Sequence, residues 1–233
     1  MLSRQSRLIY SIVILIFCVA VLGGCATRQL APSARESIEW SDLWIPHANE
    51  TNLPRVLLIG DSISRDYYSG VEKRLQGRAY VGRISSSAFI SDPALLKQIA
   101  ATLGMAKFDV IHFNNGMHGW QHTEEEYRKA FPEFLKTIQR CAPRAKLIWC
   151  STTPLKHSPS LGRSTEATNE RVAARNSIAS AFIMAKGIRV DDLYSPMLGH
   201  PELHADNVHF NQQGVELQAA QVAAQVEATL SAR

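Results

Sequence analysis

The sequence predicts a single α/β domain built on a mainly parallel sheet, and three observations lead to this prediction. Segments with strand-like and helix-like patterns alternate from Arg55 to the end of the chain, which is typical of right-handed βαβ crossovers. The strand segments are short apolar runs, as expected for strands that are buried on both faces. The 233 residues show no internal repeat and suffice for one such domain.

Five strands and five helices are expected in this region. The strands are apolar, partly β-branched runs at 56–60, 79–84, 109–113, 146–150 and 188–191. The helices lie between and after them, at 63–76, 93–104, 123–140, about 165–186 and 212–231. The third helix has a start signal, because Thr123 is followed three residues later by Glu126, the spacing of a capping box.

The first 24 residues have the features of an export signal. Arg4 and Arg7 precede an almost unbroken apolar run from Leu8 to Leu22, and two glycines then lead to Cys25. Small residues directly before a cysteine, with Leu22 three positions ahead of it, resemble a bacterial lipobox. That resemblance implies cleavage before Cys25, lipidation of this residue and a membrane-anchored protein of the bacterial envelope that faces the periplasm. The alternative is an uncleaved membrane anchor.

Residues 25–54 are expected to be a tether that becomes an ordered lead-in to the domain at 55–233. The segment has three prolines and little periodicity. Trp40, Leu43 and Trp44 are too apolar to be left in water, so we expect them to cover part of the domain surface. Stacking of the two tryptophans on a sugar is the alternative.

Composition and cysteine usage exclude several classes of function. The formal net charge of +4 is small, and basic residues interleave with acidic ones, so nucleic acid is not an expected partner. Cys141 and Cys150 flank a predicted strand, which places them too far apart for a disulfide, and both are expected to be packed thiols. No Cys/His cluster indicates a metal site, and no cofactor is expected.

Polar residues gather where the predicted strands end, which is the edge at which α/β sheets bind ligands. Ser62 follows the first strand and opens the first helix, where free N–H groups point at any negative charge beside it. The alternative for Ser62 is a simple helix cap in a turn. Later strands end in the serines 85–87 and in the amides 114–115, and a late segment delivers Asp206 and His209.

These residue types suit acyl transfer. A serine hydroxyl becomes a good nucleophile when a base accepts its proton, and an imidazole does this near neutral pH. We expect His209 to be that base for Ser62, oriented by Asp206 three residues earlier. Asn115 is a natural side-chain donor to an oxyanion, together with the backbone N–H groups of Ser62 and of the loop after the second strand.

The run 60–63 (Gly-Asp-Ser-Ile), the Asn-bearing loop after the third strand and the Asp-x-x-His of 206–209 resemble the SGNH (GDSL-type) hydrolases. The resemblance extends from about residue 55 to the last helix. It implies a flavodoxin-like three-layer α/β/α sandwich with a five-stranded, mainly parallel sheet. It also implies hydrolysis of esters, often acetyl or other acyl groups on carbohydrates. Ser62 is then the nucleophile, His209 the general base and Asp206 its partner.

The middle motifs depart from the family's pattern. The family commonly has a backbone-donating glycine after the second strand, where this chain has Ser86 and where Gly82 is the only glycine nearby. The third motif is usually Gly-x-Asn-Asp, whereas this chain ends the motif with Asn115 and Gly116, so the usual Asp support is missing. The resemblance favours Asn115 as the oxyanion donor, with Asn114 as the alternative.

Three classes of function remain open at this stage. The first is a serine esterase or deacylase that acts on a small-molecule or glycan ester. The second is an acyltransferase that uses the same triad on envelope glycans, and the third is a non-catalytic binding lipoprotein. His118 is a candidate for a substrate contact, and the alternative is a loop histidine that bonds to the backbone. Trp120 and His157 are candidates for contacts at the rim of the site, whereas His112 alternates into a strand and is expected to be packed.

Overall fold

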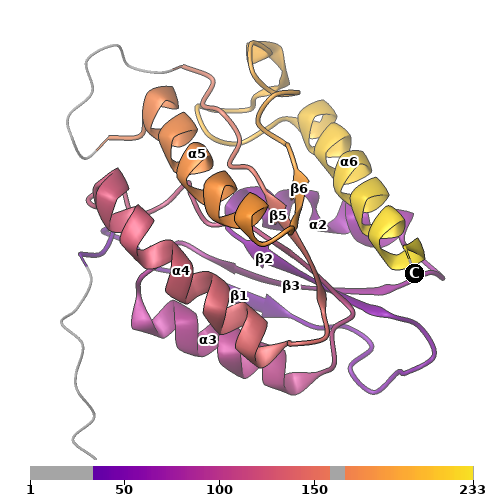
Figure 1. Cartoon of the computed structure of the whole chain (residues 1–233). Helices are drawn as coiled ribbons and strands as arrows, with labels where there is room; N and C mark the ends of the chain where they lie inside the picture. Colours follow the sequence, from indigo (N-terminus) through magenta and orange to yellow (C-terminus); the bar gives the residue numbers. More distant parts are fainter. Residues whose placement is uncertain (1–33, 158–165, 233) are drawn as a thin grey trace, which may run out of the picture. The chain divides into compact units, whose positions relative to one another are not determined.

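The computed structural model describes residues 34–157 and 166–232. These residues form a six-stranded sheet in the order β1-β3-β2-β4-β5-β6 (Figure 1). The strands are β1 (Ser41–Trp44), β2 (Arg55–Gly60), β3 (Tyr80–Ser86), β4 (Val110–Phe113), β5 (Lys146–Cys150) and β6 (Arg189–Asp191). Strands β2 to β6 pair in parallel, which confirms the predicted sheet.

The prediction of five strands is wrong by one. The additional strand, β1, lies in the segment expected to be a lead-in and pairs antiparallel with β3, from Ser41 opposite Ser86 to Trp44 opposite Arg83. It is short and lies at the edge of the sheet with most of its residues exposed, so it has no alternating apolar pattern. Its place in the sheet is decided by a partner about 40 residues away, which local sequence does not reveal.

Five α-helices and one short 3₁₀-helix are described. They are α2 (Ser62–Arg74), α3 (Pro93–Met105), α4 (Glu124–Cys141), α5 (Asn169–Ala185), η1 (Pro201–Leu203) and α6 (Gln212–Ser231). The predicted capping box of α4 is present, because Glu126 N donates to Thr123 Oγ1 (3.2 Å) and Thr123 N donates to Glu126 Oε2 (2.8 Å). Within the described ranges, no helix is long and apolar enough to span a bilayer. The predicted export signal and Cys25 lie outside those ranges.

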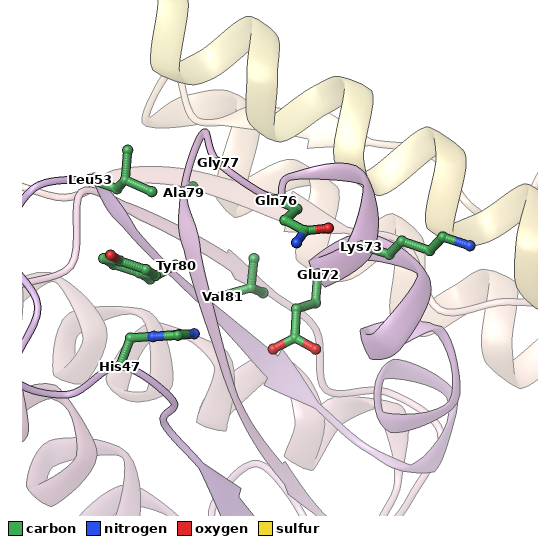
Figure 2. A pocket seen from close by; sticks show the side chains of 9 residues that line it. All are labelled: His47, Leu53, Glu72, Lys73, Gln76, Gly77, Ala79, Tyr80 and Val81. Atoms are coloured by element: carbon green, nitrogen blue, oxygen red, sulfur yellow. The ribbon is translucent and has the colours of Figure 1, made fainter.

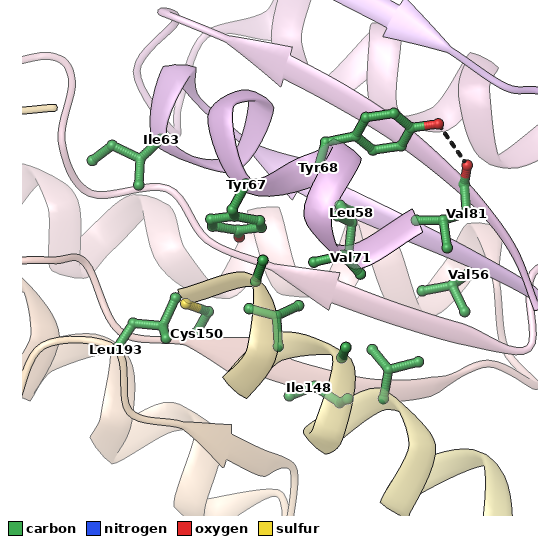
Figure 3. Close-up of a cluster of buried hydrophobic side chains, with 14 of the residues drawn as sticks. Val56, Leu58, Ile63, Tyr67, Tyr68, Val71, Val81, Ile148, Cys150 and Leu193 are labelled. Atoms are coloured by element: carbon green, nitrogen blue, oxygen red, sulfur yellow. Dashed lines mark hydrogen bonds between the residues drawn. The ribbon is translucent and has the colours of Figure 1, made fainter. Parts of the chain in front are cut away.

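The helices cover both faces of the sheet, which makes the three layers of the sandwich (Figure 1). Val56 and Leu58 of β2 pack with α2 and α6, and the intervening Leu57 and Ile59 pack with α3, α4 and α5. Figure 3 shows the first of these two cores, in which the Tyr68 hydroxyl donates to Val81 O (3.1 Å). Because β2 is buried on both faces, the turn that follows it has a fixed position.

A group of buried polar residues pairs within the core. His112 is packed as expected, and its Nε2 lies 3.0 Å from Asp191 Oδ2, while Gln221 donates to the other oxygen of Asp191 (2.7 Å). Cys150 lies beside this pair, and ligating atoms of the three groups lie within 4.8 Å of one another. Burial and the Asp191 carboxylate raise the pKa of the Cys150 thiol well above its usual value, so the thiol stays protonated. We therefore regard this cluster as structural. Cys141 and Cys150 are both free, as predicted.

A cavity of about 650 Å³ lies at the end of the sheet opposite Ser62 (Figure 2). Its lining includes Glu72 near the end of α2 and Tyr80 at the start of β3, whose ring stacks on His47 with centroids 4.7 Å apart. Ser62 instead follows the carboxyl end of β2, where ligands bind in parallel sheets. The cavity is therefore separate from the predicted site.

Candidate active site

Ser62 lies at the first position of α2, directly after a tight turn. Asp61 is the N-cap, and its Oδ1 accepts from Ile63 N (2.9 Å). Because Asp61 caps the helix, the Ser62 hydroxyl is not used for that purpose. A Cβ atom at Gly60 would lie 2.6 Å from Ser64 Oγ, so only glycine lets the first turn of α2 pack this closely against the end of β2.

The structure brings Ser62, His209 and Asp206 together as predicted from the sequence. Ser62 Oγ and His209 Nε2 are 2.8 Å apart, although the residues are separated by 147 positions in the chain. His209 Nδ1 lies 2.8 Å from Asp206 Oδ2. Ser62 is 8% exposed, whereas the side chains of His209 and Asp206 are 37% and 59% exposed. The nucleophile is thus sheltered while its base faces an open surface.

The turn that carries Asp206 and His209 is held by its own backbone. Residues His204 and Phe210 form a β-bridge across it, and Ala205 N donates to His209 O (2.9 Å). Asp206 Oδ1 accepts from the N–H groups of Val208 and His209, each at 2.7 Å. Partial burial opposes ionisation of Asp206, but these bonds and the His209 imidazole lower the pKa of its carboxyl to about 2. Asp206 therefore stays a carboxylate.

Ser86 and Gly82, the two candidates for a backbone donor to the oxyanion, lie at different places on β3. Ser86 is the last residue of β3 and follows Ser85, which pairs with Gly60, so Ser86 lies at the same edge as Ser62. Gly82 pairs with Leu57 in the middle of the sheet and is remote from that edge. The N–H groups of the next two residues are already used, by Trp40 O and by Ser86 Oγ.

Asn114 and Asn115 are also distinguished by their partners. The Asn114 amide donates to Cys150 O (2.6 Å) and Thr152 Oγ1 (3.1 Å), which uses both of its hydrogens. The Asn115 amide donates to Ala88 O (3.1 Å), which uses one of its two hydrogens. The position of Asn115 is further fixed by the Tyr127 hydroxyl, which donates to Asn115 O (2.6 Å).

The loop after β4 is anchored by a buried arginine that sequence reasoning did not single out. Arg175 of α5 has no exposed surface. Its guanidinium donates to four carbonyl oxygens of this loop, those of Gly116 (3.1 Å), His118 (2.7 Å), Gly119 (3.0 Å) and His122 (3.2 Å). Trp120, expected as a rim contact, instead lies over this guanidinium, with 4.0 Å from the ring centroid to Cζ.

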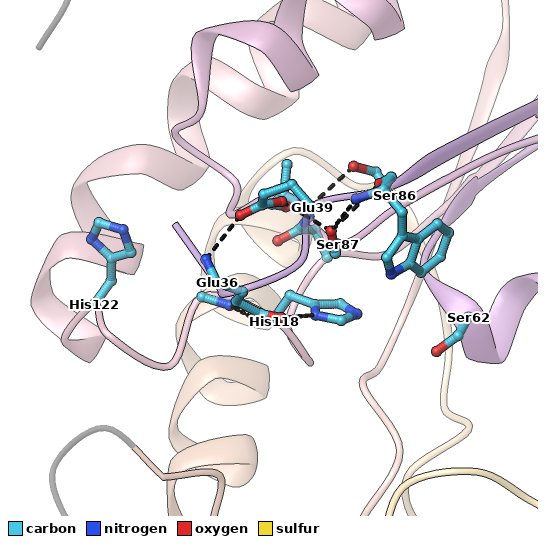
Figure 4. Close-up of polar contacts among 12 residues, drawn as sticks. Glu36, Glu39, Ser62, Ser86, Ser87, His118 and His122 are labelled. Carbon is cyan, nitrogen blue, oxygen red and sulfur yellow. Dashed lines mark hydrogen bonds and ion pairs between the residues drawn. The ribbon is translucent and has the colours of Figure 1, made fainter. Parts of the chain in front are cut away.

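The same loop is held from the other side by the lead-in segment (Figure 4). The Glu36 carboxylate accepts from Gly119 N (2.9 Å) and lies 3.1 Å from His118 Nδ1. Glu39 accepts from Ser87 Oγ (2.9 Å), and Trp40 N donates to the same Ser87 oxygen (2.9 Å). The lead-in is thus part of the wall of the site.

Glu36 and His118 shift each other's protonation. Burial opposes the charge on both groups, but their mutual hydrogen bond and the other charges and hydrogen bonds around them together outweigh it, so the pKa of Glu36 falls and that of His118 rises. The carboxylates of Asp61 and Glu39 add to the rise at His118. His157, the remaining candidate for the rim, donates from its backbone N to Asn207 Oδ1 (2.8 Å), which places it near the turn of His209.

Comparison with solved structures shows that the chain has the fold of GDSL-type hydrolases. A lipase/acylhydrolase from Enterococcus faecalis has a TM-score of 0.60 and 21% identity, covering 76% of this chain and 96% of the other. A putative acylhydrolase from Bacteroides fragilis has a TM-score of 0.63 and 16% identity, covering 78% and 93%. A carbohydrate esterase of family 3 from Talaromyces cellulolyticus has a TM-score of 0.59 and 16% identity, covering 78% and 100%. No family model and no curated protein matches the sequence.

Proposed function

We propose that this protein is a serine esterase that removes acyl groups, in particular acetyl groups, through an acyl-enzyme on Ser62. The observation that carries the proposal is the continuous chain of contacts from Ser62 Oγ to His209 Nε2 and from His209 Nδ1 to Asp206, each 2.8 Å. This is the order of nucleophile, base and orienting carboxylate that acyl transfer requires. The likeness in fold to esterases and acylhydrolases supports it.

Each group has a definite task in this mechanism. His209 Nε2 accepts the proton of Ser62 as Oγ attacks the ester carbonyl, and the pair of electrons moves to the carbonyl oxygen. The imidazolium then returns the proton to the alcohol that leaves. A water molecule, activated by the same imidazole, attacks the acyl-enzyme and releases the acid. The Asp206 carboxylate fixes the ring so that Nε2 faces Ser62 and stabilises the imidazolium between these steps.

Three donors are proposed for the oxyanion: the backbone N–H groups of Ser62 and Ser86 and the side-chain amide of Asn115. The Ser62 N–H belongs to the first turn of α2, where helical partners are lacking. The second hydrogen of the Asn115 amide supports Asn115 over Asn114, whose amide is fully used. The place of Ser86 at the edge of the sheet supports it over Gly82.

The substrate is proposed to be an ester on a carbohydrate. The exposed side chains of His209 and Asp206 leave the base accessible to a large ligand from outside, while the sheltered Ser62 needs only the acyl group to reach it. A structural neighbour is described as an acetyl xylan esterase. The location is proposed from the lipobox-like sequence before Cys25, which supports a lipid-anchored enzyme of the bacterial envelope that faces the periplasm.

The test is hydrolysis of a chromogenic acetyl ester by a soluble chain of residues 26–233. We expect turnover in the wild type, its loss in Ser62→Ala, and labelling of Ser62 by a serine-reactive phosphonate. A folded chain that neither turns over a panel of acyl esters nor takes the label would point to the non-catalytic alternative. A screen of acylated glycans, with and without added sugar acceptors, separates the hydrolase from the acyltransferase.

A further inference from the structure

A second pair of carboxylate and imidazole groups lies at the same edge of the sheet as the proposed nucleophile. Glu36 and His118 come from the lead-in and from the loop after β4, and they are 82 residues apart in the sequence. Figure 4 shows the His118 ring between Glu36 and Ser62. Neither residue belongs to the triad or to the three proposed oxyanion donors, so the pair has no role in the mechanism as described.

We propose that His118, held as an imidazolium by Glu36, stabilises the negative charge that develops on the ester at Ser62. The proposal rests on the esterase function above and adds a charged residue to that site. Positive charge placed in advance near a developing oxyanion lowers the barrier because the surrounding protein need not reorganise during the reaction.

The orientation of the ring supports this role. Glu36 binds Nδ1, on the side of the ring away from Ser62, so Nε2 is on the side that faces the nucleophile (Figure 4). Nε2 is buried and has no hydrogen-bond partner among the described residues. A buried N–H without a partner normally costs free energy, so such groups in native structures call for an explanation. An anionic transition state on this side of the ring provides one.

The hydrogen bond to Glu36 also makes the charge depend on pH. A carboxylate at Nδ1 keeps the proton of the neutral imidazole on Nδ1. The Nε2–H group, and the positive charge, then exist only in the imidazolium. The charged groups around the ring are Glu36 and Glu39 of the lead-in, Asp61 before α2, and Arg175 of α5, which donates to His118 O. Burial by itself lowers the pKa of His118, but the three carboxylates together outweigh it, favour the imidazolium and raise that pKa.

The indole of Trp40 packs against the His118 ring. The indole of Trp40 lies edge-on to the His118 ring, with centroids 6.3 Å apart and planes at 80°, and Arg65 of α2 lies over the indole at 4.7 Å. Main-chain contacts with Ser87 fix the backbone of Trp40 but not its side chain. Stabilisation by the charge of the ring requires no direct contact between Nε2 and the ester.

The test is the pH dependence of kcat/KM for an acetyl ester, measured with the full chain in detergent. In the wild type, kcat/KM is expected to fall at alkaline pH from a higher to a lower plateau as His118 loses its proton. His118→Gln keeps a polar side chain but is always neutral. Its kcat/KM should stay at the lower plateau over the whole pH range, about tenfold or more below the upper plateau of the wild type. The loss should be mainly in kcat, and the alkaline step should be absent.

Glu36→Gln separates a positioning role from a purely structural one. The amide can still accept from Gly119 N but carries no charge, so the alkaline step should move to lower pH. Glu39→Gln is the matched control, since Glu39 lies nearby but does not bond to the ring, and its step should move less. Circular dichroism shows whether each variant is folded.

The outcomes distinguish the two proposals. Wild-type turnover together with an unchanged plateau and an unchanged alkaline step in His118→Gln would overturn the role of His118 and leave the esterase standing. A step that stays in place in Glu36→Gln would overturn the role of Glu36. A wild-type chain without turnover and without a label on Ser62 would overturn the proposed function and this inference with it.

Discussion

The buried guanidinium of Arg175 gives the sharpest test of how the site is held together. We consider Arg175→Met, which keeps an unbranched apolar stem and removes every N–H donor. Burial lowers the pKa of Arg175 to about 10, so the wild-type side chain is protonated at neutral pH. The substitution therefore removes a charged donor from the carbonyl oxygens of the loop after β4.

The expected loss of stability follows from the partners that these carbonyls retain. Gly119 O still accepts from His122 N (3.1 Å), and His122 O still accepts from Arg171 (2.6 Å). Gly116 O and His118 O lose the donor that the structure gives them. A buried carbonyl left unpaired costs about 1–3 kcal/mol, so the two together predict a loss of about 2–6 kcal/mol. A domain of ordinary stability, about 5–15 kcal/mol, would mostly stay folded.

Urea unfolding of the soluble chain measures this loss. Arg128→Met is the matched control, since Arg128 lies on the surface of α4 with 52% of its side chain exposed and pairs with Glu125 at 3.5 Å. Its free energy of unfolding should change by no more than about 0.5 kcal/mol. Arg175→Met should also lower kcat/KM by more than the folded fraction explains, because the loop carries Asn115. A loss of stability no larger than that of the control would refute the reasoning.

Two further predictions concern the triad and the anchor. Asp206→Asn should lower kcat by about 10³-fold or more, because a neutral amide neither fixes the ring of His209 nor stabilises its charge. Since the pKa of Asp206 is lowered to about 2, its carboxylate persists as the pH falls and is lost only near that value. The acid limb of kcat/KM above about pH 4 should thus contain no proton taken up by Asp206, and a slope of two protons there would contradict this. Cys25→Ser should move the full chain out of the membrane fraction and abolish metabolic labelling with a fatty acid. Unchanged retention without a label would indicate an uncleaved anchor.

The parallel part of the fold was predictable because its information is local. Most residues of the strands β2 to β5 are buried, each strand contains apolar β-branched residues, and the segments between them have helical patterns. The short strand β1 has neither property. Leu43 and Trp44 are apolar but 42% and 54% exposed, so the residue types there do not follow the burial of the strand. Only the pairing with β3 makes it part of the sheet.

The proposed triad was predictable for a related reason. Ser62 follows a strand that is easily recognised, and the turn with Asp206 and His209 precedes the last helix, so topology alone sends them to one edge of the sheet. Glu36 gave no such signal, because nothing in a polar lead-in indicates a contact 82 residues away. The sequence did contain a signal for Arg175. It lies on the apolar stripe of α5 with Val172, Ile178 and Ala179, and a charge on a buried stripe needs partners.

Two oppositely charged side chains hold the loop after β4. Gly116 stands where the family commonly has Asp, and Gly119, with φ of +71°, adds a second flexible position, so the loop is costly to order by itself. Glu36 binds it at the N–H of Gly119, and Arg175 binds it at its carbonyls. Opposite charges therefore engage the two ends of one peptide group, that of His118 O and Gly119 N. Because Glu36 lies in the segment that leads from Cys25 to the domain, the geometry proposed for the oxyanion site depends on how that segment is placed. Removal of residues 26–40 should then lower kcat/KM strongly and the free energy of unfolding only slightly.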